Sequence, residues 1–425
     1  MLTRLSVYKR STALITVAGI LLMSGMSSLD AISAAHAAPA APVKVSREVG
    51  EPLKAATELA QSKDYKGALA KLDAAAAKAS TPAEKYQIST VRRYIYAQTK
   101  DYAKLAETLE AQLTSGMIPE AEVKLLRKEL AQVYDRAGNT AQATKAAKAY
   151  ISTYGHDADL AIYVAAKALE TKDYKSAAEW AGKAIDGEVT AGRTPPETWY
   201  KIGMKAAYEN GDMAGYYAAM EKAVVRYPSD TYWRALATRG RTQKGYSIER
   251  LELDEFRLMS AAGVKLTADE KLGMAEAAFE RELSAEALAI LLPMNKNGEL
   301  EADPAKAARN LRLLNKAKAD TEADSAALST IVAEASKKND GLAIANVAEL
   351  SLSLGDAKGA VALYQSALTK PGLDAAAANA FRLRLGIAQY RAGDIAGAKK
   401  TWTSIKGTDG AQELARGWLL IAGRG

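Results

Sequence analysis

The sequence predicts an all-α protein: an α-solenoid of about ten antiparallel helix pairs, preceded by an N-terminal signal peptide. Three observations predict this fold. Apolar, alanine-rich runs have three- and four-residue spacing, short breaks between them recur at intervals of 34 to 39 residues, and no stretch has the alternation typical of a β-hairpin. Abundant alanine favours helix as well, because alanine is the strongest helix former.

The breaks share one pattern, shown by "KDYKGALAKL" at 63–72. A Gly or Lys opens each break, and we expect it to adopt the left-handed conformation that ends a helix. An Asp or Asn follows, and we expect it to cap the next helix by accepting hydrogen bonds from its free N–H groups. The Tyr of "KDY" is expected to pack over the corner. The pattern opens at Lys63, Lys100, Gly138, Lys172, Gly211, Gly355 and Gly393.

Two stretches carry a more specific pattern. Residues 199–228 combine Trp199, an Ile-Gly pair, a Gly-Asp turn and the closing Pro228, and residues 381–402 repeat the Leu-Gly pair and the Gly-Asp turn. These units resemble tetratricopeptide repeats. The resemblance implies stacked helix pairs in which the first helix of each pair lines a concave face, and that face usually takes a peptide or a partner helix.

Residues 253–291 and 406–418 further resemble a group of uncharacterised exported bacterial tetratricopeptide proteins. That resemblance implies export and no particular activity.

We expect five segments along the chain: a signal peptide at 1–37, a proline- and alanine-rich tether at 38–51, an N-terminal repeat array at 52–228, degenerate helical repeats at 229–340, and C-terminal repeats at 341–425. Composition and the position of the breaks decide these boundaries.

The signal-peptide prediction rests on three features. Arg4, Lys9 and Arg10 precede an apolar run at 13–26, and "AHA" at 35–37 offers a cleavage site after Ala37. We therefore expect a periplasmic protein with no integral membrane span after cleavage. The alternative is an uncleaved segment that anchors the chain to the inner membrane, although the run is short for a span of about 20 residues.

Composition excludes several kinds of chemistry. The chain has no cysteine, and cleavage would leave His156 as the one histidine, so we expect no metal site. No phosphate-binding loop or dinucleotide fingerprint occurs, and no cofactor is predicted. A net charge of +7 over 425 residues, without a basic run, argues against nucleic acid.

Carboxylates remain the one resource for acid–base chemistry. Asp254-Glu255 and Asp269-Glu270 are adjacent pairs, but neighbours on a helix point about 100° apart and do not share a site. Thr267, Asp269 and Glu270 instead predict the start of a helix, with Thr267 as its cap and the two carboxylates favoured by the helix dipole. We therefore predict that the protein is not an enzyme, and the alternative is a carboxylate-based hydrolase of cell-wall glycan.

Candidate binding residues follow from the resemblance. The positions that grip a C-terminal carboxylate in some tetratricopeptide repeats hold Lys128 and Gln132 in the third unit, Thr90 and Tyr94 in the second, and Tyr200 and Met204 in the fifth. The paired basic clamp is missing, so recognition of a free carboxylate at these positions is not supported.

Residues 199–233 also hold eight Tyr and Trp residues, the commonest anchors of protein interfaces. We expect half of them in the core, and Tyr200, Met204 and Tyr208 facing the groove. The predicted function is a non-catalytic periplasmic scaffold or adaptor for an envelope protein or peptide. The alternative within binding is an accessory subunit of an envelope export or uptake machine, and the oligomeric state is not indicated.

Overall fold

The computed structural model describes residues 45–423, so the predicted signal peptide and half of the predicted tether (38–44) lie outside the described residues. The remainder is not a tether, because residues 47–51 already belong to the first helix, α2 (Arg47–Gln61). Residues 45–423 form twenty α-helices and one short 3₁₀ helix, with no strand among them. The prediction of an all-α chain built from about ten helix pairs is confirmed. No helix within 45–423 is both long enough and apolar enough to cross a membrane.

The described chain forms two compact units, one ending at Ala219 and the other beginning at Met220. We call them the N-terminal unit (45–219) and the C-terminal unit (220–423). The division lies inside one helix, α11 (Met213–Arg226). The predicted segment boundaries at 228 and 340 stay predictions.

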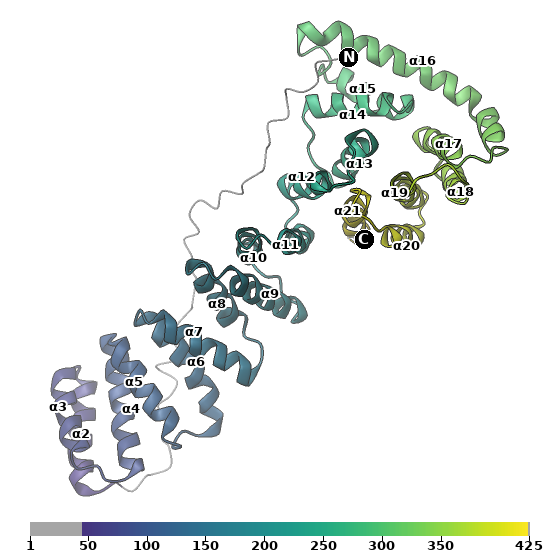
Figure 1. Cartoon of the computed structure of the whole chain (residues 1–425). Helices are drawn as coiled ribbons and strands as arrows, with labels where there is room; N and C mark the ends of the chain where they lie inside the picture. The colour runs from purple at the N-terminus through teal and green to yellow at the C-terminus, as the bar shows by residue number, and fades with distance from the viewer. Residues whose placement is uncertain (1–44, 424–425) are drawn as a thin grey trace. The chain divides into compact units, whose positions relative to one another are not determined.

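In the N-terminal unit each helix packs against the next, and α2 and α8 also contact α4 and α10, the next helices but one (Figure 1). Such contacts between alternate helices align the first helices of consecutive pairs, as a stack of helix pairs requires. The helices are α2 (Arg47–Gln61), α3 (Tyr65–Ala76), α4 (Pro82–Thr99), α5 (Tyr102–Thr114), α6 (Glu120–Arg136), α7 (Thr140–Tyr154), α8 (Ala158–Glu170), α9 (Tyr174–Thr190) and α10 (Glu197–Glu209).

The repeated "KDY" corners have the predicted geometry. Lys63, Lys100 and Lys172 lie in the left-handed region, with φ of 67°, 57° and 61°. The aspartate after each lysine accepts a hydrogen bond from the backbone N–H three residues on, at 2.9 to 3.2 Å. The glycine-opened corners have the same sign of φ and the same Asp or Asn cap. The repeated tripeptide therefore forms the turn between two helices and caps the second of them.

One consequence of this geometry is measurable at Lys172. The left-handed conformation destabilises the folded state by about 1–2 kcal/mol when the residue is not glycine. Glycine removes this strain, but its greater conformational entropy stabilises the unfolded state by about 0.4–1 kcal/mol. Lys172→Gly should therefore raise the free energy of unfolding by about 0.5–1 kcal/mol in urea denaturation. Lys183→Gly, on an exposed position within α9, is the matched control and should lower it by about 1 kcal/mol. A destabilised Lys172→Gly protein would contradict this account of the corner.

The C-terminal unit closes on itself, which the sequence did not predict. Its last helix, α21, packs against α12, α13, α19 and α20 (Figure 1). The backbone N–H of Gly245 donates to the carbonyl of Thr408 at 3.1 Å, and Arg239 pairs with Glu413 at 2.6 Å. The helices are α12 (Asp230–Thr238), the 3₁₀ helix η1 (Arg239–Thr242), α13 (Ile248–Ala261), α14 (Ala268–Phe279), α15 (Ser284–Lys296), α16 (Pro304–Ala335), α17 (Gly341–Ser353), α18 (Ala357–Ala367), α19 (Ala375–Arg391), α20 (Ile395–Ser404) and α21 (Ala411–Ala422).

Candidate functional site

The predicted binding residues on α10 divide between core and surface. Tyr200 and Met204 are only 1% and 2% exposed, so the expectation that they face a groove is wrong. The reason is that α10 is buried along two stripes: Ile202 and Ala206 pack against α8 and α9, and Tyr200 and Met204 form a second buried row. Tyr208 is 43% exposed, and its place in a binding groove stays a prediction.

The other predicted residues lie on α4 and α6. Tyr94 is 41% exposed. Lys128 donates to Asp157 Oδ2 at 2.6 Å, and Asp157 in turn caps α8 by accepting from Leu160 N at 3.1 Å. Gln132, one turn along α6, is half-buried. The ammonium group of Lys128 thus ties two neighbouring helix pairs together, and its role in binding a partner stays a prediction.

A cluster of aromatic side chains surrounds Tyr208. Its ring centroid lies 5.8 Å from that of Tyr216, and the Tyr216 ring lies 5.2 Å from that of Tyr217 in an edge arrangement. Met213, also 43% exposed, shares a helical face with both, because residues three and four apart on a helix are neighbours. We call Tyr208, Met213, Tyr216 and Tyr217 the tyrosine patch.

The tyrosine patch is suited to apolar recognition. Tyr216 and Tyr217 are half-buried, so each ring packs partly against the chain and is partly open to solvent. Burial, together with the neighbouring Tyr217 and Tyr208, raises the pKa of Tyr216, which stays a neutral phenol at physiological pH. Sequence reasoning identified Tyr208 and missed Met213. The sequence did contain the information, because Met213 lies three and four residues before Tyr216 and Tyr217, which places all three on one face of a helix.

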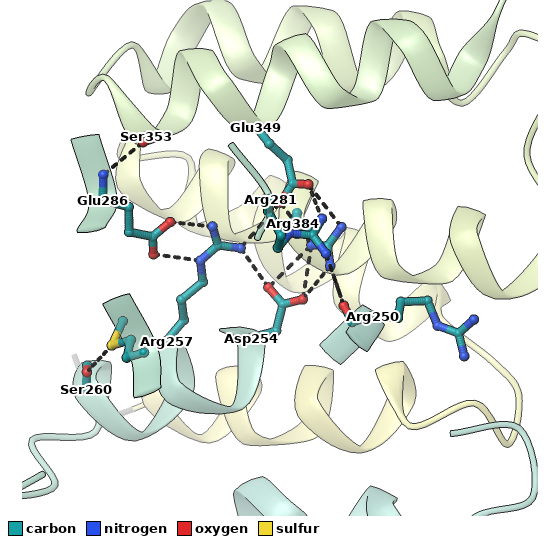
Figure 2. A network of polar contacts seen from close by, with 10 residues as sticks. Arg250, Asp254, Arg257, Ser260, Arg281, Glu286, Glu349, Ser353 and Arg384 are labelled. Atoms are coloured by element: carbon teal, nitrogen blue, oxygen red, sulfur yellow. Dashed lines mark hydrogen bonds and ion pairs between the residues drawn. The ribbon is translucent and has the colours of Figure 1, made fainter. Parts of the chain in front are cut away.

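The C-terminal unit buries a network of ion pairs at the junction of α13, α17 and α19 (Figure 2). Arg384 of α19 lies between Asp254 and Glu349. Its Nε and Nη2 donate to Asp254 Oδ2 at 3.0 and 2.8 Å, and it contacts Glu349 at 3.3 Å. All three side chains are almost fully buried. The network therefore joins residues 130 positions apart in the sequence.

Two further arginines complete the network (Figure 2). Arg257 donates to Asp254 Oδ1 at 2.8 Å and to both oxygens of Glu286 at 2.8 and 2.5 Å. Arg281 pairs with Glu349. Three guanidinium groups thus meet three carboxylates, and their formal charges balance.

The arginines keep the buried carboxylates ionised. Burial opposes ionisation of Asp254, but Arg384 and Arg257 outweigh it and hold the pKa of that carboxyl below its usual value. The pKa of Glu349 is lowered in the same way, against burial, by Arg384 and Arg281. A general acid needs a raised pKa instead. These carboxylates are therefore suited to holding helices together and poorly suited to acid catalysis.

The two adjacent carboxylate pairs behave as the sequence predicts. Glu255 accepts from Tyr246 Oη at 2.7 Å and from Arg241, so it shares no partner with Asp254. Thr267 and Glu270 form a reciprocal capping box at the start of α14. Within residues 45–423 no cluster of three or more His, Cys, Asp or Glu is placed to hold a metal ion.

No protein-family model matches the chain, and no curated protein matches it. Among solved structures, the chain is similar to a tetratricopeptide repeat protein from Parabacteroides merdae ATCC 43184, with 12% identity, TM-score 0.29, and 79% of this chain and 99% of that chain covered.

It is also similar to the C-terminal part of a TPR repeat-containing protein from Cytophaga hutchinsonii (11%, TM-score 0.28, 77% and 98% covered) and to yeast Tom70 (12%, TM-score 0.22, 88% and 95% covered). Because the TM-scores are low, the fold description rests on the helices and corners of this chain. On that geometry it is a helical-repeat protein whose helix pairs resemble tetratricopeptide repeats.

Proposed function

We propose that this protein is a non-catalytic scaffold or adaptor that binds a partner protein or peptide through the tyrosine patch. The observation that carries the proposal is the patch itself: Tyr208 and Met213 are accessible to solvent, while Tyr216 and Tyr217 are held half-buried beside them. Tyrosine and methionine are enriched at interfaces, since both bury a large apolar area. Rings that already pack partly against the chain also lose less conformational entropy on binding.

The proposed setting is the periplasm. It is supported by the charged and apolar segment before the cleavage signal at 35–37, with an uncleaved anchor in the inner membrane as the alternative. A partner would then be an envelope protein or peptide. An accessory subunit of an export or uptake machine would use the same surface.

A scaffold is favoured over a glycan hydrolase by the partners of the buried carboxylates. Burial raises the pKa of Glu255, but this carboxylate is held by Arg241 and Tyr246 and shares no partner with Asp254. A glycosidase needs one carboxyl group with a raised pKa beside a second, ionised one. Asp254 and Glu349 are both held ionised by arginines, which supports a structural role for them.

The test is a double substitution, Tyr208→Ala with Met213→Ala, followed by capture of partners from an envelope extract and quantitative mass spectrometry. Because both side chains are well exposed, the fold should survive. We expect recovery of the specific partner to fall about tenfold or more, as the loss of interface anchors produces. Tyr200 is left in place, because removing a buried tyrosine would unfold the helix pair.

The matched control is Leu342→Ala with Ile248→Ala, which removes two similarly exposed apolar side chains from the C-terminal unit. It should leave capture unchanged. Equal recovery with the wild-type protein and the patch variant would refute the proposed binding surface.

A further inference from the structure

The C-terminal unit contains a pocket of about 320 Å³ between α13, α14, α19 and α21. Its lining includes Arg257, Ser260, Met274, Tyr390, Arg391 and Trp418. This volume is at the lower end of the range for ligand pockets, about 300–1,000 Å³, so it suits a small molecule.

Arg391, in the last turn of α19, is the exposed cation of the pocket lining. Within residues 45–423 its guanidinium makes no hydrogen bond or ion pair, although it is exposed to solvent. The neighbouring Arg257 is satisfied by Asp254 and Glu286. Because the buried network already balances three arginines with three carboxylates, Arg391 adds one surplus positive charge beside it.

The pKa of Arg391 reflects this surplus. Its side chain is exposed along one edge, but the surrounding protein removes part of its water. This desolvation and the charge of Arg257 lower the pKa of Arg391, while Glu286 and Tyr364 act in the opposite direction. The guanidinium remains protonated at physiological pH, since arginine ordinarily loses its proton only far above neutrality. A bound anion would offset the repulsion from Arg257, and a planar carboxylate matches the donor fork of a guanidinium.

The indole of Trp418 forms another part of the lining. Trp418 is only 3% exposed, and its Nε1–H is buried without an acceptor. Because this nitrogen has no surface accessible to solvent, the indole offers the pocket its apolar ring and its N–H is not available to a ligand. The same indole stacks on Trp402, with centroids 5.6 Å apart, and meets Tyr390 edge-on at 6.0 Å. Aromatic rings thus form an apolar wall next to the surplus charge.

We propose that this pocket binds a small organic carboxylate, with its anion on Arg391 and its apolar body against Tyr390 and Trp418. One surplus charge fits a monoanion, and the aromatic wall requires more than an inorganic ion. The site lies in the C-terminal unit and involves none of the tyrosine patch, so it goes beyond the proposed function and can fail or hold independently of it.

The test is saturation-transfer NMR on the full mature chain with acetate, benzoate, phenylacetate and indole-3-acetate as probes. Phenylacetamide, which has the same shape without the charge, is the matched ligand control. We expect the aromatic carboxylates to bind, acetate to bind more weakly, and phenylacetamide to bind about tenfold more weakly than phenylacetate or worse, as the loss of a charged hydrogen-bond partner implies.

Two variants assign the binding to the pocket. Arg391→Gln should weaken phenylacetate about tenfold or more, and Tyr390→Leu, which removes an aromatic ring of the lining, should weaken it about threefold or more. Arg312→Gln, on the exposed face of α16, should change nothing. The proposal is overturned if no carboxylate binds at about 10 mM, a concentration at which even weak ligands are detected. Equal affinity for phenylacetamide, or unchanged affinity in both pocket variants, would overturn it as well.

Discussion

Arg384→Met is expected to lower the free energy of unfolding by about 3–5 kcal/mol, because it leaves buried carboxylates without their counter-charge. Asp254 has no solvent exposure, and Glu349 is also buried, so water cannot replace the guanidinium. Urea denaturation followed by circular dichroism measures the loss. Arg382→Met, two residues earlier on α19 and only half-buried, is the matched control and should cost about 1 kcal/mol or less.

The effect of Arg384→Met should depend on pH in a defined direction. The pKa values of Asp254 and Glu349 are lowered in the folded state, so their contribution to stability is present above the unfolded value of about 4 and is lost as pH falls through the folded value. The difference between wild type and variant should therefore shrink below about pH 4. Equal losses of unfolding free energy in Arg384→Met and Arg382→Met would contradict a stabilising role of the network. A loss in Arg384→Met that grows as the pH falls would contradict it as well.

Trp402→Ala should also cost about 3–5 kcal/mol, the range for removing a large buried aromatic side chain. Trp402 stacks on Trp418, and its Nε1 donates to the carbonyl of Leu383 at 3.1 Å. The fit is tight, since a Cβ added at Gly386 would lie 2.1 Å from that Nε1. The cavity left by alanine would open where α19, α20 and α21 meet.

The matched control for this change is Trp180→Ala, at a half-buried tryptophan in the N-terminal unit. We expect it to cost clearly less than Trp402→Ala in the same denaturation experiment. Equal losses for the two substitutions would show that the packing around Trp402 contributes no more to stability than that of a half-buried tryptophan.

Local rules explain what the sequence could predict. The corners at Lys63, Lys100 and Lys172 are readable because each cap joins an aspartate to a backbone group three residues away. The capping box at Thr267 is equally local. Helix periodicity and these caps were therefore sufficient to predict an all-α architecture of repeated helix pairs.

Non-local packing explains what the sequence could not predict. Arg384 meets Asp254 across 130 residues, and no local pattern distinguishes it from an exposed arginine. The closure of α21 onto α12 and α13 has the same origin. Tyr200 and Met204 have the spacing of a groove-lining row, but whether a row on α10 is covered depends on the neighbours that pack on it.

Site-specific photo-crosslinking tests the central claim, that the tyrosine patch binds a partner protein, most directly. A photoreactive benzoyl-phenylalanine replaces Tyr208 in one protein and the similarly exposed Leu342 in a matched one, and the cross-linked species from intact cells are identified by mass spectrometry. We predict one reproducible protein partner joined at position 208 and absent at position 342. No cross-link at position 208, or the same set of proteins at both positions, would contradict the account.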